Sequence, residues 1–290
     1  MSDIEKQSYI QPHDLIIFDD KHYLFCGDST DEKSFQFMQE QASLTLTSPP
    51  YNAGGGGYDK SQKYLSKNDD LMSDEEYNTL LSKVLANALK HSKYVFWNIA
   101  HTSGNKMSVI DFNYYHKNEY VDTIIWAKRT TLPAIEPNVM NSDFEYIFIY
   151  TNIKDNGKHI RVGDDFRGTI SNVIIEDRNM QNEYSSIHKA LMPIKLADKI
   201  IQTFTKENDL VLDTFGGLGT TLMSCIKNNR RCCLVELQPF YCEKTIERYL
   251  DFIVGKPNIK IIRNGEIIPY EQVREMCKKD QFNLFDFIDE

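Results

Sequence analysis

The chain has 290 residues, of which 26% are charged and 41% hydrophobic, and its formal net charge is −9. This length fits one large α/β domain, or one domain with an insertion, and allows a sizeable buried core. No run of 18 apolar residues occurs and the N-terminus is polar, so we expect neither a membrane span nor a signal peptide. The six cysteines fit neither zinc-ligand pairs nor a disulfide framework, so we expect a reducing, cytoplasmic compartment.

The first chemical motif follows a short predicted β-strand. Ser43–Thr47 is typical of a strand, and the sequence TSPPYN, residues 47–52, ends it with two prolines. The prolines fix the backbone and carry no amide hydrogen, so a carbonyl is held outward without a competing donor. That carbonyl and the Ser48 hydroxyl can accept hydrogen bonds from an amino group, and the Tyr51 ring can stack on a planar base. We call residues 47–52 the proline motif; a simple loop stop is the alternative interpretation.

A glycine-rich loop and a helix follow the proline motif. Gly54–Gly57 are costly to order, and we expect the loop from Ala53 to Asn68 to be a mobile lid rather than a tolerated surface loop. Ser73–Lys90 is predicted to be a helix, because Ser73 and Glu76 form a capping-box pattern before a run with leucines on one face.

The second chemical motif is a glycine-rich segment, residues 213–220, which we call the glycine turn. Leu210–Leu212 is suited to a buried parallel strand, and Thr220–Lys227 can form the helix after the turn. Gly216, Gly217 and Gly219 permit a tight turn and close approach of a ligand to the backbone. Strand, glycine turn and helix together bind nucleotides at the carboxyl end of a parallel sheet, although the glycine spacing differs from the dinucleotide fingerprint and from a phosphate loop.

An acidic residue at the end of the next predicted strand supports nucleoside binding. Arg231–Glu236 is an apolar run that ends in a carboxylate 23 residues after Asp213. A carboxylate in that place can accept hydrogen bonds from both ribose hydroxyls. We therefore expect the glycine turn to bind a nucleoside, with a solvated strand end as the alternative. The turn has no basic residue that would indicate phosphate binding.

The order of the two motifs resembles the permuted, beta-class amino-methyltransferases of DNA, over residues 14–250. The resemblance implies a doubly wound, Rossmann-like α/β fold with a mostly parallel seven-stranded sheet and a circularly permuted motif order. It also implies S-adenosylmethionine as cofactor, no metal, and direct methyl transfer to a flipped base. The residues implied to hold the base are Ser48, Pro49, Pro50 and Tyr51. The residues implied to bind the cofactor are Asp28, His188, Pro193, Asp213, Phe215, Gly217, Gly219, Thr220 and Glu236.

The residue before the two prolines narrows the implied substrate. Family members that methylate cytosine N4 usually carry Ser there, as Ser48 does, whereas those that methylate adenine N6 usually carry Asp or Asn. The resemblance therefore implies cytosine N4 in double-stranded DNA, with adenine N6 as the runner-up and a non-catalytic DNA-binding relative as a third class. RNA or protein amides are less favoured, because those enzymes usually place the glycine segment first. A restriction–modification system with a possible cognate endonuclease, or an orphan epigenetic role, is implied.

Basic residues between the two motifs are the candidates for DNA contact. A net charge of −9 is unusual for a protein that binds phosphates, so the local distribution of charge matters more than the sum. We expect target recognition within residues 127–187, with Lys128, Arg129, Arg161 and Arg167 on the DNA. A solvated surface is the alternative interpretation of these charges.

The expected organisation is a catalytic domain over residues 1–255 and a small C-terminal appendage over residues 256–290. Target recognition is left with about 60 residues, which is little for an interface on the order of 1,000–2,500 Å². We therefore expect a two-fold homodimer whose interface is apolar at its centre and leaves Tyr51 and Gly54–Gly57 accessible.

Overall fold

The computed structural model describes residues 8–52, 72–129, 138, 140–153, 160, 171–177 and 191–275. The strands in these residues are β1 Leu15–Phe18, β2 His22–Cys26, β3 Ala42–Thr47, β4 Ser92–Ile99, β5 Tyr120–Lys128, β6 Phe144–Tyr150, β7 Val173–Glu176, β8 Leu210–Asp213, β9 Arg231–Glu236, β10 Ile259–Arg263 and β11 Glu266–Pro269. The helices are the 3-10 helix η1 Glu32–Phe35 and the α-helices α1 Asp74–His91, α2 Lys106–Tyr115, α4 Ile194–Phe204, α5 Thr220–Lys227 and α6 Pro239–Phe252.

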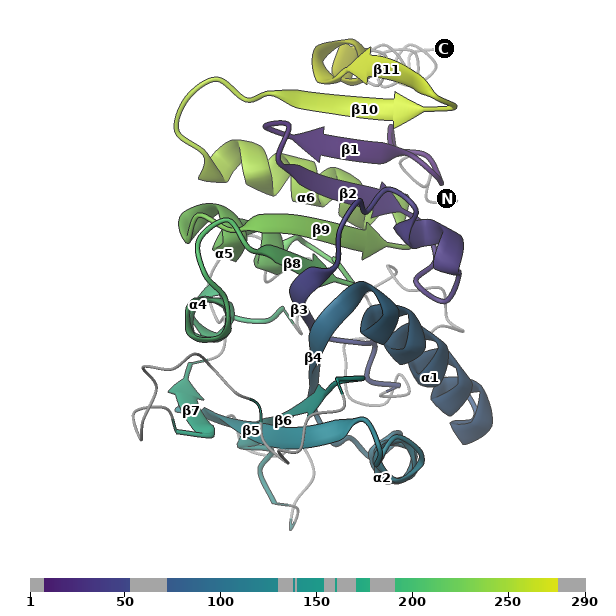
Figure 1. The fold of residues 1–290 in the computed structure, drawn as a ribbon, viewed down its shortest axis with the longest axis vertical. Helices are drawn as coiled ribbons and strands as arrows, with labels where there is room; N and C mark the ends of the chain where they lie inside the picture. The colour runs from purple at the N-terminus through teal and green to yellow at the C-terminus, as the bar shows by residue number, and fades with distance from the viewer. Residues whose placement is uncertain are drawn as a thin grey trace, which may run out of the picture.

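All of the described strands form one eleven-stranded sheet, in the order β11-β10-β1-β2-β9-β8-β3-β4-β6-β5-β7 (Figure 1). Five neighbouring pairs are parallel and five are antiparallel. The α/β class is as predicted, but the described sheet is larger and more mixed than the expected sheet of seven mostly parallel strands. The difference arises at the edges, where the antiparallel strands β1, β10 and β11 extend one side and β7 extends the other.

The parallel strands β2, β9, β8, β3 and β4 form the centre of the sheet. Cys26 of β2 lies opposite Glu236 of β9, and Thr47 of β3 lies opposite Trp97 of β4. The carboxyl ends of these strands therefore meet at one edge, which is where ligands bind in open α/β sheets.

Helices cover both faces of this centre, so most residues of its strands are buried. One buried cluster combines the sheet with residues of α4, α5 and α6, and another combines β4 and β6 with residues of α1 and α2. Helix α1 begins directly after Ser73, whose side chain and that of Glu76 form the predicted capping box. The fully buried Trp97 and Phe112 stack in the second cluster.

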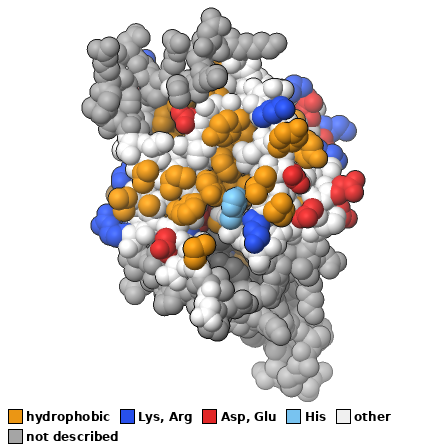
Figure 2. All heavy atoms as spheres, turned by 90° about the horizontal axis from the view of Figure 1, so that it is seen from below, with side chains coloured by type: hydrophobic (Ala, Val, Ile, Leu, Met, Phe, Trp, Pro, Cys, Tyr) orange, Lys and Arg blue, Asp and Glu red, His pale blue; other side chains and the backbone are white. Residues whose placement is uncertain are grey.

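One face of the molecule carries many exposed apolar side chains. Figure 1 places α2, β5, β6 and β7 at the bottom of the view. Figure 2 looks at this side and shows apolar side chains gathered over its middle, with charged side chains toward its margins. The exposed apolar residues of these four elements are Met107, Ile110, Tyr114, Tyr115, Tyr120, Phe144, Val173 and Ile175. We call this surface the α2 face; exposed apolar surface of this kind is typical of a partner-binding site.

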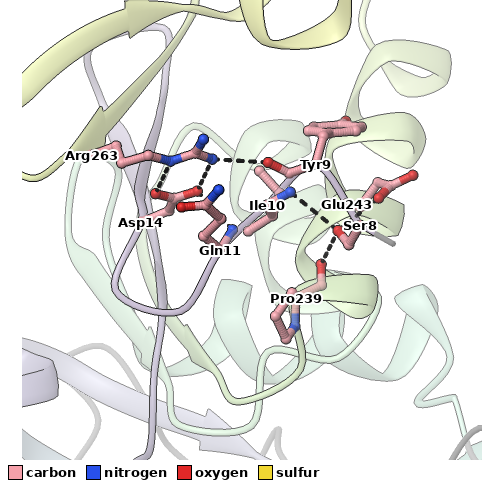
Figure 3. Close-up of polar contacts among 8 residues, drawn as sticks. All are labelled: Ser8, Tyr9, Ile10, Gln11, Asp14, Pro239, Glu243 and Arg263. Atoms are coloured by element: carbon pink, nitrogen blue, oxygen red, sulfur yellow. Dashed lines mark hydrogen bonds and ion pairs between the residues drawn. The ribbon is translucent and has the colours of Figure 1, made fainter. Parts of the chain in front are cut away.

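The first described residues and the C-terminal hairpin are tied together at one edge of the sheet (Figure 3). Arg263 of β10 donates to both carboxylate oxygens of buried Asp14, at 2.8 and 2.6 Å, and to the Tyr9 carbonyl at 2.9 Å. Ser8 donates to Glu243 of α6 at 2.7 Å. Residues 259–269 therefore continue the main sheet, whereas the sequence pattern predicts a separate appendage from residue 256.

Within the described ranges, no helix combines the length and apolar character needed to cross a membrane. In the same residues, no group of three or more His, Cys, Asp or Glu side chains is arranged to hold a metal ion. The described cysteines are free and buried: Cys26, Cys225, Cys232, Cys233 and Cys242.

Candidate active site

The proline motif and the glycine turn leave neighbouring parallel strands at the same edge of the sheet. Thr47, the last residue of β3, donates from Oγ1 to Asp213 Oδ1 at 2.9 Å, and the two residues are 166 positions apart. Thr47 Oγ1 also lies 3.0 Å from the Thr214 hydroxyl, and Ser29, just beyond β2, donates to the Thr214 carbonyl. All four residues are buried. The two motifs therefore form one site.

The glycine turn lies close against β9 and α6. Gly217 and Gly219 have φ angles of 50° and 70°, in the left-handed region that favours glycine. A Cβ atom at Gly219 would lie 2.6 Å from Thr245 Cγ2 of α6, and one at Gly216 would lie 3.2 Å from Leu234 Cβ of β9. Thr245 also donates from Oγ1 to the Gly217 carbonyl at 2.9 Å. The turn is thus a closely packed backbone cradle at the start of α5.

Glu236, at the end of β9, is bound to the backbone of this cradle. Its Oε2 accepts a hydrogen bond from the Gly217 amide at 2.7 Å, and its Oε1 accepts one from the Gln238 amide at 2.9 Å. Burial raises the pKa of Glu236, and these amide hydrogen bonds oppose the rise. Each carboxylate oxygen has a second lone pair, so Glu236 can also accept hydrogen bonds from ribose hydroxyls.

Asp213, at the end of β8, is buried and accepts three hydrogen bonds. The donors are the Thr47 hydroxyl, the Phe215 amide at 3.1 Å and the Thr221 hydroxyl at 2.6 Å. Burial raises the pKa of Asp213 to about 7 against these hydrogen bonds, and the nearby Glu236 carboxylate adds to the rise. Its ionised form gains from a nearby positive charge, which the sulfonium and amino groups of S-adenosylmethionine carry. The cradle and the two buried carboxylates therefore fit this cofactor.

The other residues expected to bind the cofactor differ in their placement. Asp28 is exposed two residues after the end of β2, beside the end of β9, and its Oδ1 accepts a hydrogen bond from the Thr30 amide at 2.8 Å. Phe215 is half-buried in the glycine turn, and Thr220 is buried at the start of α5. Pro193 is buried directly before α4, which packs on α5. His188 lies outside the described residues.

In the proline motif, one of the two proline carbonyls is already occupied. Tyr77 of α1 donates to the Pro50 carbonyl at 2.6 Å. Among the described residues no donor reaches the Pro49 carbonyl, and the Ser48 hydroxyl lies 3.2 Å from the Tyr51 hydroxyl. Ser48 and Pro49 are therefore the residues of the motif that can receive an amino group, while Pro50 holds the motif against α1.

Asn52 joins the end of the proline motif to the segment before α1. It has a φ angle of 47° and exchanges two hydrogen bonds with the backbone of Met72, at 3.0 and 2.9 Å. These hydrogen bonds join the two described residues that flank positions 53–71. The glycines Gly54–Gly57, for which the sequence predicts a lid, lie outside the described residues.

Tyr51 leads to a buried group that the sequence pattern does not predict as part of the site. Its hydroxyl donates to Glu145 Oε2 of β6 at 2.8 Å, and Asn98 of β4 donates to the same oxygen at 3.1 Å. Lys128 Nζ of β5 lies 2.8 Å from Glu145 Oε1, and the two side chains are only 5% and 10% exposed. The available signal in the sequence is a single carboxylate within the otherwise uncharged strand Phe144–Tyr150.

The placement of Lys128 argues against the expectation that it contacts DNA. A buried ammonium group that is paired with a carboxylate cannot also reach a phosphate without leaving its partner unpaired, which is costly. Arg129, the next residue, is exposed and remains a candidate for DNA contact. Arg161 and Arg167 lie outside the described residues.

Residues 42–247 match the N6_N4_Mtase family of DNA methylases, and these residues make up most of the chain. The chain belongs to this family. DNA methylases of this family use S-adenosylmethionine, and two solved structures of similar fold contain it.

Curated relatives match this chain over different lengths. M.BslI of Bacillus sp. (strain NEB-606), a type II beta methyltransferase, is 26% identical over 243 residues, which are 72% of this chain and 25% of the relative. M.BamHII of Bacillus amyloliquefaciens, an orphan methyltransferase, is 37% identical over 67 residues, which are 23% of this chain and 25% of the relative. M.BglII of Bacillus subtilis, a type II methyltransferase, is 24% identical over 270 residues, 82% of this chain and 69% of the relative. The match to M.BslI and M.BamHII thus spans a quarter of their length.

Solved structures share the fold of this chain. The PvuII DNA methyltransferase (cytosine-N4-specific) superposes with a TM-score of 0.64 at 16% identity, covering 89% of this chain and 92% of that chain. M1.HpyAVI in its complex with S-adenosylmethionine superposes with a TM-score of 0.52 at 19% identity, covering 78% and 98%. These similarities confirm the α/β methyltransferase fold.

Proposed function

We propose that this DNA methylase transfers a methyl group from S-adenosylmethionine to N4 of cytosine in double-stranded DNA. The observation that carries the proposal is the hydrogen bond between Thr47 and Asp213, which joins the amine-binding motif to the cofactor cradle. The PvuII methyltransferase, whose fold is similar, is cytosine-N4-specific by name. Ser48 in front of the two prolines supports cytosine over adenine.

When bound, the cofactor supplies an activated methyl group on a positively charged sulfur. Glu236 accepts hydrogen bonds from the ribose, Asp28 is placed for the adenine, and Asp213 balances positive charge. The remaining residues proposed for the cofactor are Phe215, Gly217, Gly219 and Thr220 in the cradle, and His188 and Pro193 at the methionine end. Their common role is to hold the methyl group at the edge of the sheet where the proline motif begins.

The proline motif addresses the weak nucleophilicity of the base amine, whose lone pair is delocalised into the ring. Ser48 Oγ and the Pro49 carbonyl accept the two amine hydrogens and draw the nitrogen toward tetrahedral geometry. The lone pair is then directed at the methyl carbon, while Tyr51 stacks on the base. The rate enhancement comes from positioning and preorganised polarity, without a covalent bond to the protein.

A cytosine amine inside a duplex is paired and stacked and cannot reach Ser48 and the buried Pro49, so the proposal includes base flipping. With 2-aminopurine placed at the target position, fluorescence is expected to rise when the protein and cofactor bind. Unchanged fluorescence on DNA that the protein does methylate would argue against extrusion of the base.

Mass spectrometry of nucleosides tests the substrate. Bacterial genomic DNA without amino methylation, incubated with the protein and cofactor, is expected to yield N4-methylcytosine. Ser48→Ala is expected to lose this product while it still binds the cofactor. Only N6-methyladenine would overturn the cytosine assignment, and no methylated nucleoside despite cofactor and DNA binding would indicate a non-catalytic relative.

We also propose that two copies associate through the α2 face, in a restriction–modification or orphan setting within a reducing cytoplasm. The apolar side chains of this face support the homodimer (Figure 2). Light scattering during size-exclusion chromatography is expected to give twice the chain mass of 33.7 kDa. Ile110→Lys, which places a charge on this face, is expected to give the monomer. A monomeric parent protein would contradict the dimer.

A further inference from the structure

Three side chains of the site form a row of hydrogen bonds that ends at a buried ion pair. The Ser48 hydroxyl lies 3.2 Å from the Tyr51 hydroxyl, which donates to Glu145 Oε2 at 2.8 Å. Lys128 Nζ lies 2.8 Å from Glu145 Oε1, and Asn98 donates to Oε2 at 3.1 Å. The row therefore runs from Ser48 into the protein, to the Glu145 carboxylate. Lys128 and Asn98 hold this carboxylate in place.

The hydrogens determine the direction of this row. A carboxylate only accepts hydrogen bonds, and a phenol has a single hydrogen to donate. Because Tyr51 donates its hydrogen to Glu145, the bond between Ser48 and Tyr51 has Ser48 as donor. The Ser48 oxygen keeps its lone pairs for the amino group of a base. Every hydrogen in the row thus points toward Glu145.

Burial keeps the row polarised in this direction. Burial raises the pKa of Tyr51 well above its ordinary value, and the negative charge of Glu145 adds to the rise, so the phenol stays a donor. Lys128 balances the charge of Glu145, and both side chains are almost fully buried. In such surroundings hydrogen bonds strengthen and successive bonds polarise one another.

We propose that Glu145 is a positioning residue for methyl transfer, which polarises Ser48 through Tyr51 and takes up the proton that the amine loses. This inference rests on the proposed function, because it needs an amino group bound at Ser48. The distinct feature is that the final proton acceptor lies two side chains away from the reacting nitrogen.

Each atom in this transfer has a defined destination. The amine nitrogen forms a bond to the methyl carbon, and the carbon–sulfur bond breaks with its electron pair remaining on sulfur. The nitrogen then loses one proton to Ser48 Oγ, while Ser48 passes its own proton to Tyr51 and Tyr51 passes its own to Glu145. The two hydroxyls are restored, and one proton has moved from nitrogen to the carboxylate.

Single-turnover methylation with saturating cofactor and DNA tests the inference. Glu145→Gln keeps the shape of the side chain but cannot take up the proton, so the rate is expected to fall roughly 100-fold, as for loss of general-base catalysis. Dissociation constants for cofactor and DNA, measured separately, are expected to change less than about threefold, which is under 1 kcal/mol. Asp14→Asn is the matched control, since Asp14 is also a buried carboxylate paired with a cation, Arg263, but lies outside the site.

A double-variant cycle separates the row from two independent effects. Tyr51→Phe breaks the row but keeps the ring, so its rate is expected to fall as well. The combination with Glu145→Gln is expected to be no slower than the slower single variant, because both changes interrupt one unit. Losses that multiply, or a Glu145→Gln rate equal to that of the parent, would overturn the inference.

A second variant covers the case in which Glu145→Gln does not fold, and an NMR measurement tests the row without relying on activity. If Glu145→Gln unfolds, Glu145→Gln/Lys128→Met removes both buried charges and is expected to show the same loss of rate. With ¹³Cζ-labelled tyrosine, the Tyr51 resonance, assigned by its absence in Tyr51→Phe, is expected to move in Glu145→Gln but not in Asp14→Asn. If the parent methylates no DNA, the proposed function fails and the proton step with it. If the parent is active but the resonance does not move, the row alone fails.

Discussion

The cofactor side and the base side of this site are built by different means. On the cofactor side, one continuous strand–turn–helix–strand segment, residues 210–236, provides the cradle and the carboxylates, and backbone geometry sets its shape. On the base side, side chains from four separate strands or loops meet: Tyr51, Asn98, Lys128 and Glu145. The first arrangement is local in sequence, and the second depends on the strand order β3-β4-β6-β5.

This difference has consequences for tolerance to change. A backbone cradle is sensitive to added volume, because a new Cβ atom has no rotamer of its own and its packed neighbours must shift instead. A network of side chains is instead sensitive to loss of a partner, because a buried polar group is left unsatisfied. Variants can therefore break the two sides separately.

The largest effect is expected from Gly219→Ala on the cofactor side. The new Cβ atom meets Thr245 Cγ2 at 2.6 Å, and φ is +70°. Left-handed backbone costs roughly 1–2 kcal/mol and overpacking roughly 1–3 kcal/mol, so we expect the free energy of unfolding to fall by about 2–5 kcal/mol. Urea denaturation measures this change, and calorimetry is expected to show weaker cofactor binding.

Gly265→Ala provides the matched control for that variant. Gly265 has a φ of +84°, but no atom lies within 4 Å of the position of its Cβ. It therefore carries the backbone cost without the clash, and cofactor binding is expected to stay at the parent value. Equal stability losses in the two variants would contradict the close packing of the cradle.

The next effect concerns Glu236. Glu236→Ala is expected to lose roughly 1.5–3 kcal/mol of binding free energy for S-adenosylmethionine, the range for hydrogen bonds to a charged group. DNA affinity measured without cofactor is expected to change little, because the residue lies on the cofactor side. Glu243→Ala, which removes a carboxylate of α6 that bonds to Ser8, serves as control. Parent-like cofactor affinity in Glu236→Ala would refute the ribose role.

Asp213 links cofactor binding to pH. Burial raises its pKa to about 7, so much of this group is protonated in the free protein below neutrality. Positive charge on the cofactor favours the ionised form, so binding is expected to release a proton and to weaken by up to about tenfold per pH unit below the pKa. Calorimetry in buffers of different ionisation enthalpy measures the proton. Affinity that is equal at pH 6 and pH 8, as we expect for Asp213→Asn, would argue against this role in the parent protein.

The same raised pKa determines the sign of a stability change. Between the ordinary pKa of 3.8 and about 7, the folded protein binds more protons at Asp213 than the unfolded chain does. The contribution of Asp213 to the free energy of unfolding is therefore present at low pH and is lost as the pH rises through this window. The difference between parent and Asp213→Asn, followed by denaturation over this range, isolates that contribution. If the parent instead became more stable relative to Asp213→Asn as the pH rises, the raised pKa of Asp213 would be contradicted.

The same division explains which parts of the site could be predicted from sequence. The glycine turn and Glu236 were predictable because strand, glycines and delayed carboxylate are all contained in 27 consecutive residues, 210–236. Glu145 was not, since it lies 94 positions from its partner Tyr51 and only the antiparallel pairing of β6 with β4 brings it there. Strands β10 and β11 were missed for a similar reason, because β10 pairs with β1 and β11 pairs with β10, which joins the two ends of the described chain.

The smallest effect compares two adjacent residues on the base side, Lys128 and Arg129. The sequence predicts DNA contact for both, but Lys128 is buried against Glu145 while Arg129 is exposed. If Arg129 contacts one phosphate, Arg129→Gln is expected to reduce the slope of log affinity against log salt by about 0.9. With this smaller slope, the affinity of Arg129→Gln for DNA falls by roughly threefold less than that of the parent when the salt rises from 50 to 200 mM.

Lys128→Met is expected to leave this slope unchanged, because the ammonium group of Lys128 is paired with the Glu145 carboxylate and does not contact the DNA. It should instead lower the rate of methyl transfer, since Glu145 loses the cation that holds it beside Tyr51. Fluorescence anisotropy with labelled duplex at several salt concentrations measures the slope for the two variants and the parent. A slope reduced by Lys128→Met as much as by Arg129→Gln would place Lys128 on the DNA after all. It would also mean that the ion pair between Lys128 and Glu145 opens when DNA binds. The base side of the site would then be less rigid than the backbone cradle of the cofactor side.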